Sequence, residues 1–404
     1  MKPLYRVDEK LNYDRFNLKT NPFSKLSSEG IKNIDEIHVF QDIDSKITEL
    51  LSEVINKKSS AALALVGDLG SGKTQRLKGL HRLMEKAGFS MYVKIDTNDI
   101  IKIIKDIFSV FFYMKEEKKS RFERFKDKID RSLGKELGFD DIWLLEKGKF
   151  KSTEIGNKLK RHMSEFEVSC LILDELENLV SAPEQDLISF FEVLRQFISD
   201  MPSSSLFIMA CTKEGAEQVK KANPAFVMRL HRILDVEPLT DKKALELVEK
   251  RLATERIDPE KVLNPIYPFD ESGINYVNKM IKGNPRLLLR MLHTIISAAV
   301  KDELIEIIDD RFISELMTTP SSLEEYILKV PQDLRDLVTL IIRKFNGGPV
   351  SYIEISKETK LSPTTIYENL KELVSMGLMA NEKGKFEVVQ GIRIMLEEPE
   401  KKES

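Results

Sequence analysis

Apolar runs of the length of β-strands recur between residues 61 and 236. The clearest of them contain few polar residues, which is typical of parallel strands that are buried on both faces of a sheet. Segments with helical spacing, such as 42–55 with its single apolar face, separate these runs. The alternation predicts an α/β fold built on a parallel sheet. The predicted strands span 61–66, 90–95, 168–175, 205–212 and 233–236.

From Thr240 onward the hydrophobic spacing becomes helical. Thr240 is a good N-cap for a helix over 241–253. A later helix is predicted to begin at Pro285, because proline is favoured in the first turn and Gly283 and Asn284 precede it. We therefore expect a helical domain over 239–318, behind an α/β core that takes up residues 1–238.

The C-terminal part of the chain, 319–404, has the pattern of a winged helix. Two short helices are joined by a three-residue turn, and Ser362-Pro363 is a strong start signal for the second helix. A β-hairpin follows, and a segment with one proline and two serines precedes the domain. The predicted elements are a linker over 318–323, helices over 352–359 and 363–376, and a hairpin over 380–389.

Composition narrows the class of protein. With 63 basic and 66 acidic residues among 404, the net charge is -3, so any contact with nucleic acid or a membrane must be local. The two cysteines, Cys170 and Cys211, are too few for a disulfide framework and lack metal-site spacing, so we expect buried, inert thiols. No apolar stretch approaches the roughly 18 residues of a membrane span, and the chain begins without a signal segment. We expect a cytoplasmic protein with no membrane partner.

Residues 67–74 match G-x-x-x-x-G-K-[ST], the phosphate-binding loop or P-loop. They follow a predicted strand and precede a helix, which is the context that this motif requires. The backbone N–H groups of such a loop and the positive end of the helix dipole bind a polyphosphate. We expect ATP or ADP here, with Lys73 at the β- and γ-phosphates and the Thr74 hydroxyl as a ligand of Mg²⁺. The predicted nucleotide-binding residues are Gly67, Asp68, Leu69, Gly70, Ser71, Gly72, Lys73 and Thr74.

Two acids end the predicted strand 168–175. Ligands of open α/β sheets bind at the carboxyl ends of the strands. Asp174 is therefore predicted to hold Mg²⁺, and Glu175 to orient or deprotonate the water that attacks ATP. The alternative is an ordinary strand followed by an acidic helix cap, because Glu177 continues the acidic pattern.

Three further residues stand where the state of a nucleotide can be sensed. Thr212 ends a predicted strand and is placed to contact the γ-phosphate. Arg229 precedes the last strand, at a position from which an arginine reaches the phosphate of a neighbouring subunit. Arg286 follows a rigid Gly-Asn-Pro turn at a helix start and is predicted to close on the γ-phosphate. For both arginines, a surface ion pair is the alternative.

The second helix of a winged helix usually lies in the DNA major groove. Its outward side here carries hydroxyl groups and a lysine, which suffice to position phosphates. Glu368 and Glu372 interrupt this side, so docking of a protein is the alternative to DNA binding. The predicted contacts with duplex DNA are Ser362, Thr364, Thr365, Tyr367 and Lys371 on the helix, and Lys383 and Lys385 on the wing.

With these pieces in order, most of the chain resembles an AAA+ ATPase of the initiator clade, similar in layout to the archaeal Orc/Cdc-type origin-binding proteins. The resemblance implies an α/β P-loop core, a helical lid and a winged helix. It also implies slow, switch-like, Mg²⁺-dependent ATP hydrolysis that controls the grip on DNA. The sequence departs from the family at Thr212, where the family usually has asparagine, and in a long insertion over 114–151 that contains Trp143.

Three hypotheses about function stay open. The first is a DNA-binding switch of the replication-initiator type. The second is a helper ATPase of transposition or plasmid maintenance that acts on a protein partner. The third is a signalling ATPase whose winged helix does not bind DNA. In each of them, a second copy of the chain or another protein can dock at the ATPase interface.

Overall fold

The computed structural model describes residues 11–24, 37–116, 151–318, 330–376, 378–382 and 384–388. Lys383, Trp143 with most of the predicted insertion, and most of the predicted linker lie outside these residues. The described residues form two compact units. One contains 40–67 and 73–236, and the other contains 68–72 and the described residues outside 40–236. The predicted domain boundaries at 238 and 318 stay predictions.

A parallel sheet forms the centre of the first unit, as the apolar runs predict. Among the described residues it has five strands in the order β2-β3-β4-β1-β5, so β1 lies between two strands, β4 and β5, that come much later in the sequence. Parallel strands require crossover connections, and helices supply them. The strands are β1 (Ala61–Val66), β2 (Phe89–Lys94), β3 (Ser169–Asp174), β4 (Ser205–Cys211) and β5 (Arg232–Asp235).

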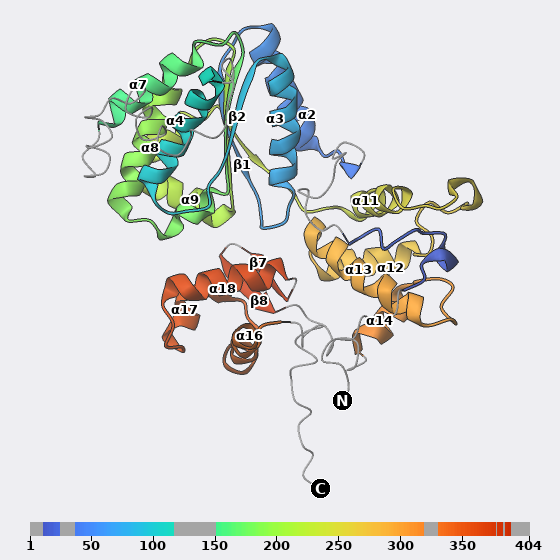
Figure 1. The fold of residues 1–404 in the computed structure, drawn as a ribbon. Helices are drawn as coiled ribbons and strands as arrows, with labels where there is room; N and C mark the ends of the chain where they lie inside the picture. Colours follow the sequence, from blue (N-terminus) through green and yellow to red (C-terminus); the bar gives the residue numbers. More distant parts are fainter. Residues whose placement is uncertain are drawn as a thin grey trace. The chain divides into compact units, whose positions relative to one another are not determined.

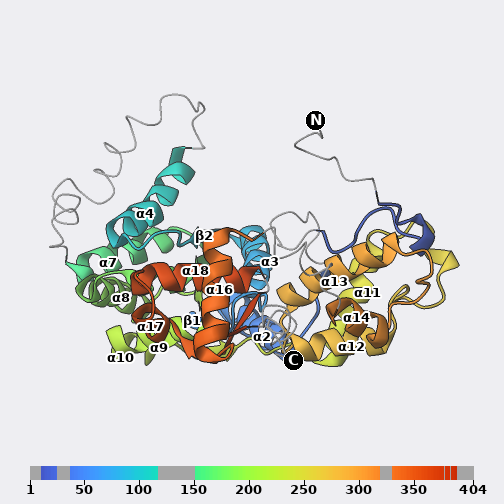
Figure 2. The same ribbon diagram turned by 90° about the horizontal axis from the view of Figure 1, so that it is seen from below.

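Helices cover both faces of this sheet because its inner strands are apolar on both sides. Along β1, for example, Ala64 packs into one apolar cluster and Leu65 into the other. Figures 1 and 2 show α4, α7 and α8 on one face and α2 and α3 on the other. The sequence did not predict α7. The helices of this unit are α2 (Asp42–Asn56), α3 (Lys73–Ala87), α4 (Ile100–Glu116), α7 (Ser152–Met163), η4 (Leu176–Ser181), α8 (Glu184–Ile198), α9 (Lys213–Ala222) and α10 (Pro224–Val227).

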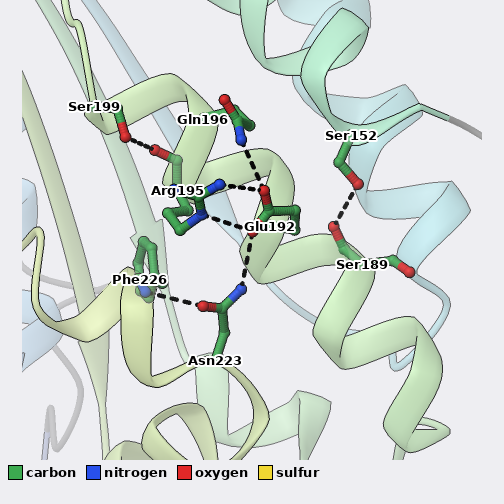
Figure 3. Close-up of polar contacts among 8 residues, drawn as sticks. All are labelled: Ser152, Ser189, Glu192, Arg195, Gln196, Ser199, Asn223 and Phe226. Carbon is green, nitrogen blue, oxygen red and sulfur yellow. Dashed lines mark hydrogen bonds and ion pairs between the residues drawn. The ribbon is translucent and has the colours of Figure 1, made fainter.

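A polar network ties α8 to the turn before α10 (Figure 3). The carboxylate of Glu192 accepts hydrogen bonds from the guanidinium of Arg195 at 2.6 and 2.7 Å, from the amide of Gln196 at 2.7 Å and from the amide of Asn223 at 3.4 Å. The hydrogen bonds from Arg195 are the main reason why the pKa of Glu192 falls to about 2. Asn223 also caps α10, because its side-chain oxygen accepts a backbone N–H of the first turn at 2.9 Å. The network therefore holds the start of the segment that leads to Arg229.

Helices dominate the second unit after residue 240. Thr240 caps α11 as predicted, since its hydroxyl oxygen accepts the backbone N–H of Lys243 at 3.4 Å. The segment 12–23 packs into the same apolar cluster as these helices through Phe16 and Phe23. The elements here are η1 (Asp14–Phe16), α11 (Asp241–Ala253), η5 (Pro259–Lys261), α12 (Glu271–Met280), α13 (Pro285–Lys301) and α14 (Asp310–Thr318).

The C-terminal elements form a winged helix, as predicted. In its small sheet the described strands have the order β6-β8-β7 and are antiparallel. Ser362 caps the second helix of the helix-turn-helix, because its hydroxyl oxygen accepts the N–H of Thr365 at 3.1 Å. The sequence did not predict β6. The elements are α16 (Gln332–Phe345), β6 (Val350–Ser351), α17 (Tyr352–Lys357), α18 (Pro363–Ser375), β7 (Met379–Glu382) and β8 (Lys385–Val388).

Candidate functional site

The P-loop and the acid pair lie at the same edge of the sheet. β4 lies between β1 and β3, and the three strands run parallel. Val66, the residue before the P-loop, is level with Cys211 on β4, while Leu173 on β3 is level with Met209. Asp174 is the last residue of β3 and comes within one residue of the level of Cys211. The sheet therefore brings together two motifs that lie far apart in the sequence.

The amino group of Lys73 is bonded to the first residue of the P-loop. This side chain is only 6% exposed, and its Nζ donates a hydrogen bond to the carbonyl oxygen of Gly67 at 2.7 Å. Gly70 and Gly72 have φ angles of +82° and +95°, a conformation that residues with a Cβ adopt at a cost. The helix α3 begins at Lys73 itself. The glycines thus let the loop curl in front of a helix N-terminus.

These residues fit a nucleotide polyphosphate. The hydroxyl of Ser71 is buried and has no hydrogen-bond partner among the described residues, so it has a donor to offer to a bound anion. A buried lysine and a helix N-terminus supply positive charge at the same loop. The hydroxyl of Thr74 and the carboxylate of Asp174 are oxygen ligands of the kind that Mg²⁺ prefers.

Asp174 is the more buried of the two acids, with an exposed fraction of 1%. Its Oδ2 accepts a hydrogen bond from the hydroxyl of Tyr92 at 2.6 Å, and its Oδ1 accepts one from the backbone N–H of Glu175 at 2.9 Å. A buried carboxylate needs such donors, because burial without them is costly. Both oxygens of Asp174 are therefore held in a defined orientation.

Glu175 turns the chain out of β3. Its φ of +62° and ψ of +43° lie in the left-handed region, which costs a residue with a side chain on the order of 1 kcal/mol. Its carboxylate forms an ion pair with the Nζ of Lys94 at 3.2 Å and accepts a weaker hydrogen bond from Asn178 at 3.4 Å. It makes no capping hydrogen bond to η4, so the alternative of a simple acidic cap is not supported.

Tyr92 and Lys94 were missed by the sequence analysis. They lie two residues apart at the end of β2, so their side chains share one face of the strand. That spacing was visible in the sequence. The pairing of β2 with β3, which brings them to the acids, was not.

Similarity to a known protein extends over most of the chain. No protein-family model matches it. An uncharacterized HTH-type transcriptional regulator of Methanocaldococcus jannaschii is 22% identical over 383 residues, which cover 91% of this chain and 89% of the relative. The strand order, the P-loop after β1 and the acids after β3 decide the fold. The chain has an α/β P-loop fold with a winged-helix domain.

Solved structures of similar layout include proteins of archaea. The Orc1 protein of Aeropyrum pernix in complex with DNA is 15% identical, with 91% of this chain and 94% of that chain covered and a TM-score of 0.47. A Walker-type ATPase of Pyrococcus abyssi is 15% identical, with coverages of 90% and 96% and a TM-score of 0.45. Cdc6p of Pyrobaculum aerophilum is 14% identical, with coverages of 94% and 93% and a TM-score of 0.42.

Thr212 and Arg229 belong to the unit that contains the parallel sheet. Thr212 follows β4 directly and is 4% exposed. Its hydroxyl oxygen caps α9 by accepting the N–H of Gly215 at 3.1 Å. Arg229 is exposed just after α10. Arg232, three residues later, forms a surface ion pair with Glu49 at 3.2 Å.

Arg286 lies in the first turn of α13, as predicted. Asn284 caps this helix by accepting the backbone N–H of Arg286 at 3.1 Å. Within the same compact unit, the side-chain amide of Asn284 donates to the carbonyl oxygen of Leu69 in the P-loop at 2.7 Å. The turn that mounts Arg286 thus has a direct hydrogen bond to a predicted nucleotide-binding residue.

The outward face of α18 has fewer residues available for DNA than predicted. Ser362, Thr364 and Thr365 are exposed. The prediction that Tyr367 lies on this face is wrong, because its ring is 5% exposed and packs edge-on against Tyr352 and Phe386 in the domain core. A tyrosine ring is largely apolar, so the core gains from burying it.

The basic side chains predicted for DNA differ in their surroundings. Lys371 is partly buried, with its Nζ 5.7 Å from the centre of the Tyr367 ring and 3.8 Å from a carboxylate oxygen of Glu368. Lys385 is exposed at the start of β8. Lys383 lies outside the described residues. The wing lysine Lys385 is thus better placed for a phosphate than Lys371.

Other kinds of site find no support in the described part of the chain. It contains no cluster of three or more potential His, Cys, Asp or Glu metal ligands. Burial raises the pKa of Cys170 and of Cys211 to about 12, so both thiols stay protonated and unreactive. None of the described helices combines the length and the hydropathy that crossing a membrane requires.

Proposed function

We propose that this protein is a Mg²⁺-dependent ATPase that acts as a slow switch and binds duplex DNA through its winged helix, with the layout of a replication initiator. The position of the P-loop and the acid pair at one edge of the sheet, in a chain that carries a winged helix, is the observation that supports this function most strongly.

In the proposed site, Lys73 and the N–H groups of the P-loop hold the phosphates. Thr74 and Asp174 would hold Mg²⁺, which neutralises phosphate charge when it is bound. Glu175 would take a proton from the attacking water. Its ion pair with Lys94 supports slow turnover, because the carboxylate must leave the ammonium group before it can act as a base.

Three residues are proposed to sense the nucleotide. Thr212 would contact the γ-phosphate with its hydroxyl hydrogen, since the oxygen already caps α9. Arg286 would reach the γ-phosphate from the turn that bonds to the P-loop. Arg229 would reach a nucleotide bound to a second copy of the chain or contact a protein partner, because it is exposed at the end of a fixed turn.

The DNA contacts are proposed for hydroxyl-bearing and basic residues of α18 and the wing. Hydroxyl groups at the start of α18 and lysines on the wing suit phosphate contacts, which set position and carry no base preference. The HTH-type name of the methanogen relative supports this assignment. The set that we retain is Ser362, Thr364, Thr365, Lys371, Lys383 and Lys385.

The test is a titration of a labelled random duplex with the full-length protein, followed by fluorescence anisotropy. It is run with ATP, with ADP and without nucleotide, at two salt concentrations. We expect binding that depends on the nucleotide and weakens steeply with salt, since phosphate contacts release counterions. Lys73→Ala is the control. Because this variant should not bind nucleotide, its affinity for the duplex should be the same with ATP, with ADP and without nucleotide.

One observation favours a second function, a signalling ATPase whose winged helix docks a protein. Glu368 and Glu372 are exposed on the same face of α18 as the hydroxyl groups, and acids repel DNA phosphates. An absence of duplex binding in every nucleotide state, together with intact ATP hydrolysis, would select this function over the DNA switch.

A further inference from the structure

The end of the edge strand β2 holds the acid pair of the proposed ATPase site. β2 pairs only with β3 in the described sheet, and Lys94 is level with Asp174. Tyr92 and Lys94 project from the same face of β2, and each contacts one acid: Tyr92 contacts Asp174 and Lys94 contacts Glu175. A strand with no established role therefore supplies one side-chain contact to each acid.

The contact to Asp174 is the shorter of the two, at 2.6 Å against 3.2 Å. A tyrosine hydroxyl is the donor in such a pair, because an ionised carboxylate only accepts. Short hydrogen bonds to a charged acceptor are among the stronger ones in proteins. The bond is also shielded, because Asp174 is almost fully buried.

The hydroxyl of Tyr92 and the backbone N–H of Glu175 each donate a hydrogen bond to a different oxygen of Asp174. Every carboxylate oxygen has two lone pairs, so one lone pair per oxygen is left for a cation or its water shell. The two donors fix the rotation of the carboxyl group and so the direction of these remaining lone pairs. The backbone is held as well, since the carbonyl oxygen of Asp174 accepts the N–H of Ile95 at 3.0 Å.

We infer that Tyr92 is a positioning residue for Mg²⁺ binding: its hydroxyl orients the carboxylate of Asp174 toward the cation that accompanies the nucleotide. The inference rests on the proposed function. Partners that orient a metal ligand typically change metal affinity by about 10–100-fold when they are removed. Tyr92 acts through Asp174 and is not itself expected to touch nucleotide or metal.

The substitution Tyr92→Phe separates this role from packing. It removes only the hydroxyl and keeps the ring beside His81, whose ring centre lies 5.8 Å away. Binding of a fluorescent ADP analogue is titrated at a series of free Mg²⁺ concentrations and in EDTA. We expect about tenfold more Mg²⁺ to be needed for the metal-dependent gain in affinity, with the affinity in EDTA unchanged. This readout requires no turnover.

Two controls make the test specific. Tyr13→Phe also removes a tyrosine hydroxyl hydrogen bond, to Ser297 at 3.1 Å, and should leave the Mg²⁺ titration as in the parent. In the background Asp174→Asn, adding Tyr92→Phe should have no further effect on the titration, because the residue it positions is already changed. Thermal unfolding of each variant confirms that it is folded.

Three outcomes would overturn the inference. The first is a Mg²⁺ requirement of Tyr92→Phe equal to that of the parent. The second is an equal loss of affinity with Mg²⁺ and in EDTA, which would mean that Tyr92 supports the P-loop and not Asp174. The third is a nucleotide affinity of the parent protein that does not depend on Mg²⁺. This outcome would overturn the proposed function as well, so it differs from a failure of the inference alone.

Discussion

The nucleotide edge of the sheet and the outward face of α18 hold their polar side chains in different ways. At the sheet edge, Lys73 and Asp174 are buried and bonded to fixed partners at 2.7 and 2.6 Å. On α18, Thr364 and Thr365 are exposed, and the hydroxyl of Thr365 is hydrogen-bonded to another exposed hydroxyl, that of Ser362 at 2.8 Å.

This difference predicts how strongly each region responds to substitution. At the sheet edge the protein orders the side chains before any ligand arrives, so one change disturbs a preorganised site. On α18 the ligand itself must order exposed side chains, and the entropy that these side chains lose weakens binding. Single changes there should cost less and should depend on salt.

The largest effects should come from Lys73→Ala and Glu175→Gln, and the two should differ in kind. Lys73→Ala is expected to abolish nucleotide binding. Glu175→Gln is expected to bind nucleotide like the parent and to slow hydrolysis by about 100-fold or more, because only the base is lost. Fluorescent-nucleotide binding and phosphate release, measured on the same preparations, check both.

Lys86→Ala is the matched control for these two variants. Lys86 is an exposed lysine in the last turn of α3, the helix that begins with Lys73. It should bind and hydrolyse like the parent. Turnover of Glu175→Gln at the parental rate would show that the acids at the end of β3 are assigned wrongly.

A smaller effect is expected for the wing, from Lys383→Ala combined with Lys385→Ala. The affinity for duplex DNA should fall by about tenfold at low salt, and the slope of log affinity against log salt should become shallower by about 2, one for each phosphate contact. ATP hydrolysis without DNA should not change. Anisotropy titrations at several salt concentrations measure both quantities.

The matched control removes two exposed lysines elsewhere, Lys242→Ala with Lys261→Ala. It changes the net charge equally but should leave the salt slope as in the parent. An equal loss of affinity in both double variants would mean that overall charge, and not the wing, attracts the DNA.

The smallest effect concerns stability, through Glu192→Gln. The hydrogen bonds from Arg195 lower the pKa of Glu192 to about 2 in the folded protein, so the ionised form stabilises the fold above the ordinary pKa of a glutamate. This contribution is lost as the pH falls toward 2. We expect Glu192→Gln to lower the free energy of unfolding by about 1–2 kcal/mol at neutral pH. This difference between parent and variant should become smaller below about pH 4.5.

Urea unfolding at neutral and acidic pH measures this difference in the free energy of unfolding. Glu246→Gln is the control, because Glu246 has the same side-chain exposure as Glu192, 31%, and pairs with two lysines of its own helix, whereas Glu192 also bonds to Asn223 outside its helix. Its cost should stay below about 0.5 kcal/mol. If the difference in free energy of unfolding between the parent and Glu192→Gln stayed constant over the whole pH range, the network would not depend on an ionised Glu192.

Much of the fold was predictable from local patterns. The buried strands were recognised because parallel strands are apolar on both faces, and α11 was recognised from its threonine cap and its spacing. The two-residue strand β6 was missed, since so short an element has no periodicity. The helix α7 was missed as well.

The candidate site was predictable in part. The P-loop follows from a motif whose spacing has a physical reason, and the acids follow from their place at a strand end. Tyr367 was placed on the wrong side of α18, because its hydroxyl suggested exposure while its ring favoured the core. Lys94, which pairs with Glu175, gave no signal of its own.

By itself the sequence determined which segments form strands and helices, where the P-loop lies and which acids end β3, because these depend on neighbours along the chain. Only the tertiary structure decided that β2 lies beside β3 and that Tyr92 reaches Asp174. The reason is that a crossover helix lets a parallel strand pair with the next strand in the chain, as β2 does, or with a distant one, as β1 does with β4 and β5, and packing decides between them.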